Sequence, residues 1–188
     1  MKRPHQRRRL APVTVTLCAA LLLALVGPAS AAESHNFTAS LFGTVGGPLD
    51  VSGDDPGLGQ TGFQLGFAWL TQPKTQVGVR VGQVTMDGEQ LEGLFDPELL
   101  YATIGGEYRY RETYYESGVF LGLGVYSLEG IAGGASVDDS SLGINLGVTG
   151  DFPLTRKLSF LAEVSVHSAD LDYAQLFAFA HLGLAYHF

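Results

Sequence analysis

Cysteine is almost absent from this chain of 188 residues. The one cysteine, Cys18, follows Leu17 inside an apolar stretch near the N-terminus. A lipoprotein signal places its cysteine at the end of such a stretch and after a small residue, so we expect no lipid anchor at Cys18. Because residues 32–188 contain no cysteine, disulfide bonds and thiolate chemistry are excluded from that part of the chain.

Basic residues are also scarce, and five of the eleven Lys and Arg lie within residues 1–31, which hold none of the nineteen Asp and Glu. A basic start, the apolar stretch 11–26, the Gly27-Pro28 break and the small residues 29–31 are typical of a secretory signal. We therefore predict a cleaved signal peptide over 1–31 and one domain over 32–188. With His neutral, that domain carries 6 − 19 = −13, so nucleic acid is not expected as a partner.

A long apolar run is the third feature that residues 32–188 lack, although 46% of the whole chain is apolar and 25 residues are glycine. Instead, apolar residues alternate with other residues, most clearly over 176–188. Counting back from Phe188, every second residue as far as Leu176 is apolar, while the alternates are small, titratable or aromatic. A period of two indicates one face of a β-strand.

The same alternation predicts eight strands in all. Their expected ranges are 36–45, 62–70, 76–84, 99–110, 117–127, 141–152, 157–167 and 176–188. Lengths of about 9–12 residues fit strands that cross a membrane at a tilt. Short connections (71–75, 111–115, 153–156) alternate with longer ones (46–61, 87–98, 128–140, 168–174). The fold class that this predicts is all-β, an eight-stranded antiparallel up-and-down transmembrane β-barrel with both termini at the short-turn end.

Aromatic residues on the apolar face gather at strand ends beside the short connections, as in an aromatic girdle. They are Trp69, Tyr108, Tyr110, Phe152, Phe160, Tyr186 and Phe188. A soluble lipocalin-like binding barrel is the alternative, with its apolar face inward and a charged face outward. The non-apolar face here is rich in glycine, which suits the inside of a narrow barrel better than a solvent face.

Charged residues on the non-apolar face are expected to lie in the lumen. They are Arg80, Glu107, Arg109, Asp151 and Glu163. Buried charges need partners or water, so we predict a polar network across the lumen that includes Arg80 and Glu107 on neighbouring strands. A satisfied internal salt bridge is favoured over a gate or a proton path.

Glu163, Ser165 and His167 share a face of one predicted strand, which raises the question of a hydrolase. Alternate residues on a strand lie about 7 Å apart, too far for direct Ser–His contact unless the side chains lean together. The outer-membrane lipid A deacylases carry a His-x-Ser motif, whereas this chain has His167-Ser168 without the spacer. We expect no enzyme activity, and the scattered histidines predict neither a metal site nor a cofactor.

The long connections hold thirteen of the nineteen acidic residues and no Lys or Arg. A solvated, hydrophilic rim is one interpretation. The other is a site for Ca²⁺ or Mg²⁺, because these ions prefer oxygen ligands, and such ions would bridge the rim to lipopolysaccharide phosphates. The best local cluster for this possible cation-binding loop is Asp50, Asp54 and Asp55, which lacks EF-hand spacing.

Taken together, the signal, the alternating connections, the girdle and the terminal pattern resemble the small eight-stranded outer-membrane proteins of the OmpA/OmpX type. In that family the terminal pattern, here Leu184, Tyr186 and Phe188, is the signal that the barrel-assembly machinery recognises. The resemblance implies an integral, monomeric protein of a Gram-negative-type outer membrane that contacts outer-membrane lipids and lipopolysaccharide. It also implies a non-enzymatic role in envelope integrity, surface interaction or adhesion. A barrel that transports or modifies lipids or small apolar molecules remains the alternative.

Overall fold

The computed structural model describes residues 36–49, 59–86, 91 and 93–188. The predicted signal peptide therefore lies outside the described residues. The eight strands are β1 (Phe37–Pro48), β2 (Gln60–Gln72), β3 (Thr75–Thr85), β4 (Phe95–Arg111), β5 (Glu116–Ala132), β6 (Ala135–Pro153), β7 (Leu158–Ala169) and β8 (Leu176–His187). In the described part of the chain, no helix is long and apolar enough to cross a membrane.

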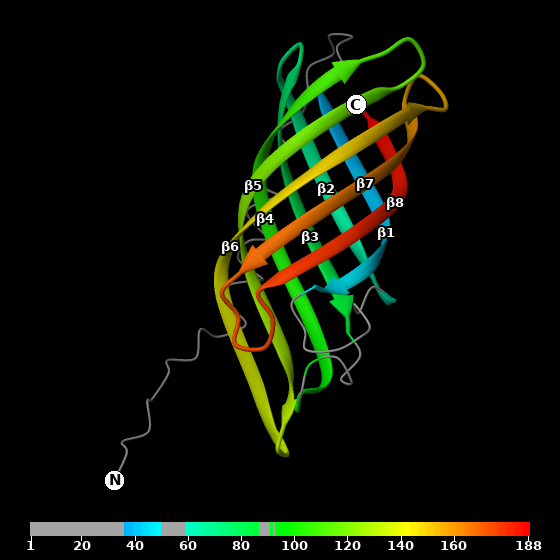
Figure 1. The fold of residues 1–188 in the computed structure, drawn as a ribbon. Helices are drawn as coiled ribbons and strands as arrows, with labels where there is room; N and C mark the ends of the chain where they lie inside the picture. The colour runs from blue at the N-terminus through cyan, green and yellow to red at the C-terminus, as the bar shows by residue number, and fades with distance from the viewer. Residues whose placement is uncertain (1–35, 50–58, 87–90, 92) are drawn as a thin grey trace. The chain divides into compact units, whose positions relative to one another are not determined.

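Each strand pairs antiparallel with the next one, and β8 closes the barrel on β1, as Figure 1 shows. The predicted fold class is confirmed. The connections β2–β3, β4–β5 and β6–β7 form what we call the short-turn end, where β1 begins and β8 ends. The opposite end is called the loop end.

The apolar face of every strand points outward, and the other face points into the lumen. Leu123 and Leu182 on the outside are 64% and 61% exposed, whereas Gln64 and His181 on the inside are fully buried. An apolar belt of this kind is stable only against an apolar surrounding, because exposed apolar surface costs about 25 cal/mol per Å² in water. The lipocalin-like alternative requires the opposite arrangement and is wrong.

Large aromatic side chains fill the lumen because glycines lie beneath them. A Cβ added at Gly82 would overlap the ring of Tyr101, and one at Gly147 would overlap the ring of Phe120. Eight strands enclose only enough space for side chains, so each large ring needs a neighbour without one.

The prediction of a loop over residues 128–140 is wrong. β5 and β6 continue through it as a hairpin, closed by Gly133 and Gly134, both with positive φ. Two consecutive residues with positive φ make the turn that best joins two antiparallel strands, and Gly-Gly was its signal in the sequence. Alternation failed to reveal this extension because most of its outward residues, such as Glu129 and Asp138, are polar. The hairpin extends beyond the β7–β8 connection at the lower end of Figure 1.

Candidate functional site

The lumen holds the residues that the sequence singled out, and Arg80 of β3 lies at their centre. Its Nε is 3.0 Å from Glu163 Oε2 on β7, and its Nη2 is 3.3 Å from Glu107 Oε2 on β4. The guanidinium carbon lies 3.8 Å from the centre of the Phe120 ring. One cation thus joins two carboxylates across the barrel and stacks on an aromatic face.

Neutral donors complete the coordination of these two carboxylates. Glu107 accepts hydrogen bonds from Gln76 (2.9 Å) and Thr149 (2.7 Å). Glu163 accepts one from Gln64 (3.2 Å), whose own amide oxygen accepts from the Tyr101 hydroxyl (2.9 Å). Burial of charge is tolerated when it is paired and hydrogen-bonded in this way.

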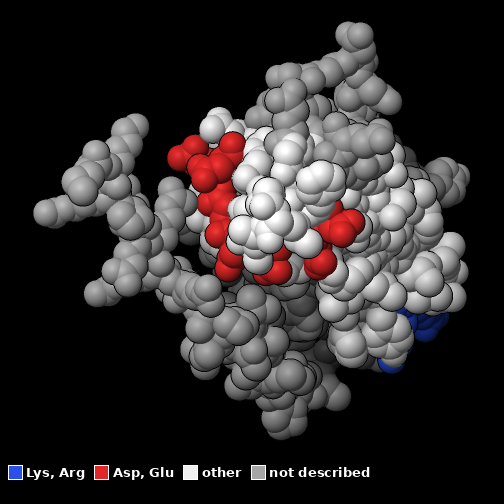
Figure 2. Space-filling model, turned by 90° about the horizontal axis from the view of Figure 1, so that it is seen from below, with Lys and Arg blue, Asp and Glu red and all other residues white. Residues whose placement is uncertain are grey.

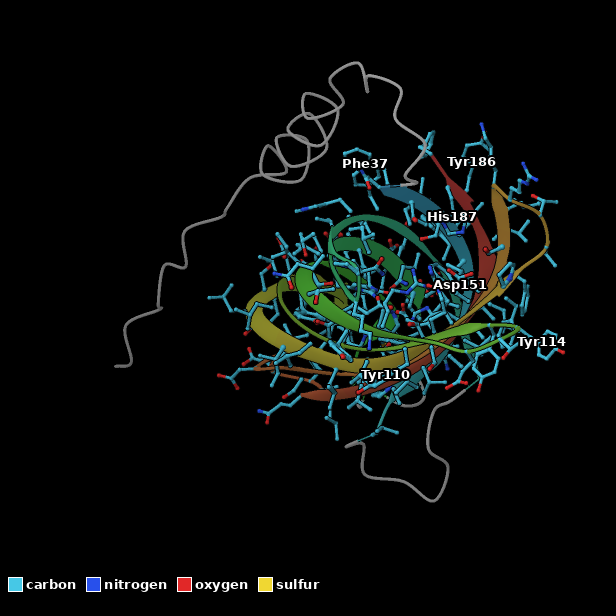
Figure 3. All side chains as sticks on the ribbon, turned by 90° about the horizontal axis from the view of Figure 1, so that it is seen from above. Phe37, Tyr110, Tyr114, Asp151, Tyr186 and His187 are labelled. Atoms are coloured by element: carbon cyan, nitrogen blue, oxygen red, sulfur yellow. The ribbon has the colours of Figure 1, made fainter. Side chains whose placement is uncertain are left out.

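A second ion cluster lies nearer the short-turn end. Arg109 Nη2 is 2.7 Å from Asp151 Oδ2 and 3.3 Å from Glu116 Oε2. Arg109 also donates to Gln76 (3.4 Å), which links this cluster to the first. Figure 3 looks onto this end and shows Asp151 inside the barrel wall, with Tyr110 and Tyr186 outside. All five predicted lumen residues are therefore brought into two connected clusters.

A cavity of about 50 Å³ lies beside these clusters. Arg109 Nε and Asp151 Oδ1 belong to residues that line it, and neither atom makes a hydrogen bond to a described residue. A polar cavity of this size has room for ordered water, which would satisfy such atoms. It is too small for a lipid or a typical solute.

A third chain of contacts corrects the prediction that Ser165 and His167 are too far apart. Ser165 Oγ is 2.9 Å from His167 Nε2 and 3.1 Å from His181 Nε2. His167 Nδ1 lies 2.9 Å from the Tyr126 hydroxyl, and His181 Nδ1 lies 2.8 Å from Thr44 Oγ1. The two β7 side chains lean toward each other, which backbone spacing alone does not reveal. Sequence reasoning missed His181 and Thr44, since they come from β8 and β1.

The loop half of the lumen is apolar. Its core, which we call the plug, combines strand residues with side chains of the β3–β4 and β7–β8 connections. Leu91, Leu94, Leu128 and Leu171 are at most 1% exposed, and Phe177 is fully buried. The sequence analysis missed these leucines, because they lie in predicted connections that are otherwise acidic and hydrophilic. Isolated leucines within acidic loops were the signal in the sequence that these loops pack into the lumen.

The outside of the loop end is acidic. Glu98, Glu129 and Asp138 lie directly opposite one another across β4, β5 and β6. Figure 2 shows the carboxylates gathered at this end. Asp50, Asp54 and Asp55 lie outside the described residues. Among the residues that are described, no group of three or more His, Cys, Asp or Glu is arranged to hold a metal ion.

The predicted assembly pattern lies on the outer surface. Leu184, Tyr186 and Phe188 are 51%, 42% and 56% exposed. The rings of Tyr186 and Phe188 meet edge to face, with centroids 4.9 Å apart. The terminal residues are therefore accessible from the outside of the barrel.

No protein-family model matches the sequence, and no curated protein matches it significantly. Several solved structures, however, are similar to the structure of this chain. Neisserial surface protein A is similar over 82% of this chain and 98% of its own, with a TM-score of 0.66 and 11% identity. The attachment invasion locus protein Ail of Yersinia pestis is similar over 81% and 99%, with a TM-score of 0.56 and 19% identity. The N-terminal β-barrel domain of Pseudomonas aeruginosa OprF is similar over 82% and 98%, with a TM-score of 0.59 and 10% identity. The fold of this chain is thus that of the small eight-stranded outer-membrane β-barrels.

Proposed function

We propose that the protein is a non-enzymatic integral outer-membrane barrel that acts through its surface, in envelope integrity, surface interaction or adhesion. The observation that carries the proposal is that the lumen is filled. Ion clusters occupy its short-turn half and the plug closes its loop half, which leaves a cavity of about 50 Å³. A lumen that its described residues fill in this way favours a role on the outside of the barrel. In the orientation that we propose, the short-turn end faces the periplasm and the loop end faces the outside of the cell.

The contact between Ser165 and His167 favours the second candidate, a lipid-modifying enzyme. Burial argues against it, because Ser165 is 1% exposed and His167 is fully buried. A nucleophile must reach the substrate, and these side chains contact only other lumen residues. The Ser165 hydroxyl lies between the imidazole rings of His167 and His181. The Nδ1 atom of each ring contacts a hydroxyl group, that of Tyr126 or Thr44, and not the carboxylate that a catalytic triad places there. The chain of contacts is suited to holding strands together.

The extracellular face determines which partners fit. Its described residues carry carboxylates and neither Lys nor Arg, and the long connections carry none by sequence. Ail, one of the similar structures, was solved with the heparin analogue sucrose octasulfate, which is a polyanion. The acidic face of this chain carries charge of the same sign as such a ligand, so we expect cationic partners, or lipopolysaccharide phosphates bridged by divalent cations. Insertion would use the barrel-assembly machinery, and we expect a monomer.

The experiment compares outer membranes of a Gram-negative host that expresses the wild type, Ser165→Ala or His167→Ala. Lipid A is then analysed by mass spectrometry. We expect the same lipid A species in cells with each protein and in cells without it. A change that appears with the wild type and disappears with both variants would overturn the non-enzymatic assignment. Heat-modifiability on gels verifies that each variant is folded.

The surface role is tested separately with the purified mature chain in nanodiscs. Binding to whole cells or to extracellular-matrix preparations is compared for the wild type and for a variant with Glu98, Glu129 and Asp138 changed to Gln or Asn. We expect the variant to bind less and the wild-type binding to fall with added salt, because exposed charges are screened. Equal binding by the two proteins would exclude the acidic face as the interaction surface.

A further inference from the structure

The outer wall of the barrel has an apolar groove of about 290 Å³ near the periplasmic end. It crosses β7, β8 and β1, and its outward-facing lining includes Leu158, Leu184, Tyr186, Ala39 and Leu41. Tyr186 lies opposite both Leu158 and Ala39 in the strand register. Ala39 leaves the depression because it places a methyl group where its cross-strand neighbours carry large side chains. Tyr186, the aromatic residue in this lining, belongs to the girdle, so the groove begins at the depth of the lipid headgroups.

A cation lies at the periplasmic end of this groove. Lys157 directly precedes Leu158, and its Nζ is 6.0 Å from the centre of the Tyr186 ring. The side chain thus lies back against the wall of the groove instead of extending into the periplasm. Lys157 and the adjacent Arg156 are exposed, and neither forms an ion pair with a described carboxylate.

The β6–β7 turn holds this cation in place. Thr155 Oγ1 accepts hydrogen bonds from the backbone N–H groups of Lys157 (3.2 Å) and Leu158 (3.0 Å). The carbonyl of Lys157 accepts one from the His187 N–H (2.8 Å), which ties the turn to β8. The lysine therefore has a fixed position relative to the β8 side of the groove.

Other cations at the same end differ from Lys157. Arg111 is exposed, but Glu116 neutralises it at 2.6 Å. Lys74 is exposed and forms no ion pair with a described carboxylate, yet it does not border the groove. The β6–β7 turn thus brings unpaired positive charge to this apolar groove, whereas Arg111 and Lys74 do not.

We propose that this groove binds a phospholipid with an anionic headgroup from the periplasmic leaflet. One acyl chain lies in the groove over Ala39, between Tyr186 and Leu41, and the phosphate meets Lys157 and Arg156. Charge complementarity and the depth of the groove select this occupant. The site lies on the opposite end from the acidic face, so it stands independently of the surface role proposed above.

The test is native mass spectrometry of the mature chain released from nanodiscs that contain phosphatidylglycerol and phosphatidylcholine. The wild type is expected to retain one phosphatidylglycerol in preference to phosphatidylcholine. Lys157→Gln should lower that retention about fivefold, since one basic residue at a membrane surface contributes about 1 kcal/mol. The matched control Lys74→Gln removes the same charge away from the groove and should leave retention unchanged.

A second variant tests the groove itself. Ala39→Leu fills it without changing charge, and we expect loss of the retained lipid of either headgroup. Equal losses for Lys74→Gln and Lys157→Gln would mean diffuse attraction and would overturn the site, as would unchanged retention in Ala39→Leu. A dimer peak that Ala39→Leu abolishes would identify a second copy as the occupant and would also overturn it. Heat-modifiability verifies folding of every variant.

Discussion

The two halves of the lumen are filled in opposite ways. The short-turn half joins Arg80, Glu107 and Glu163 through charge-assisted hydrogen bonds, and the loop half packs Leu91, Leu94 and Leu171 as an apolar core. Tyr101 lies where they meet, since its ring belongs to the plug and its hydroxyl donates to Gln64. Ion clusters depend on every partner being present, whereas an apolar core loses stability in proportion to what is removed. The two halves should therefore respond differently to substitution.

The largest effect is expected for Arg80→Met. The change leaves Glu107 and Glu163 buried without their shared cation, and breaking a buried ion pair costs about 3–5 kcal/mol. Urea unfolding in detergent micelles, followed through the fluorescence of Trp69, measures it. Adding Glu107→Gln and Glu163→Gln to the same chain should restore most of the stability. If the triple variant is no more stable than Arg80→Met, the loss comes from packing against Phe120 and not from charge.

A smaller loss of folding stability is expected for Leu94→Ala in the plug. Leu94 is 1% exposed, and truncation of a buried leucine typically costs about 2–3 kcal/mol. The matched control is Leu123→Ala, whose side chain faces outward and is 64% exposed. The same unfolding assay should show little change for the control. Equal losses in the two variants would mean that the plug adds no stability of its own.

Gly130→Ala tests whether Leu94 of the β3–β4 connection packs directly against β5. A Cβ at this position would lie 2.7 Å from Leu94 Cγ, so Leu94 must shift. Overpacking of this kind costs about 1–2 kcal/mol, and cleavage of the β3–β4 connection by protease should become faster. In the double variant with Leu94→Ala, the alanine has room and the two effects should be less than additive. Strict additivity would indicate that the two residues do not touch.

The smallest effect is expected for Tyr126→Phe, at the border between the two halves. It removes the hydroxyl that lies 2.9 Å from His167 Nδ1 and leaves the ring in the plug. Loss of one buried hydrogen bond costs about 1 kcal/mol. The unfolding midpoint is the measurement, and an effect as large as that of Arg80→Met would contradict this ordering.

The sequence predicted the fold and part of the ion clusters, but not the leucines of the plug. The alternation over 176–188 and the lengths of the connections were enough for the fold, because both depend on local periodicity. The sequence also placed Arg80 and Glu107 on neighbouring strands. It placed Glu163 in the same lumen network but did not reveal its direct contact with Arg80, since β3 and β7 are not neighbours and the contact crosses the lumen. Leu94 and Leu171 were missed because a connection shows no periodicity that assigns its side chains to a face.

The central claim is that the lumen is closed, and conductance of the purified mature chain in planar lipid bilayers tests it most directly. Protein insertion is verified independently by heat-modifiability of the reconstituted sample. We predict no discrete conductance steps for the wild type, because the plug fills the loop half of the lumen and the cavity in the short-turn half is only about 50 Å³. Reproducible single-channel steps from the folded wild type would contradict the account.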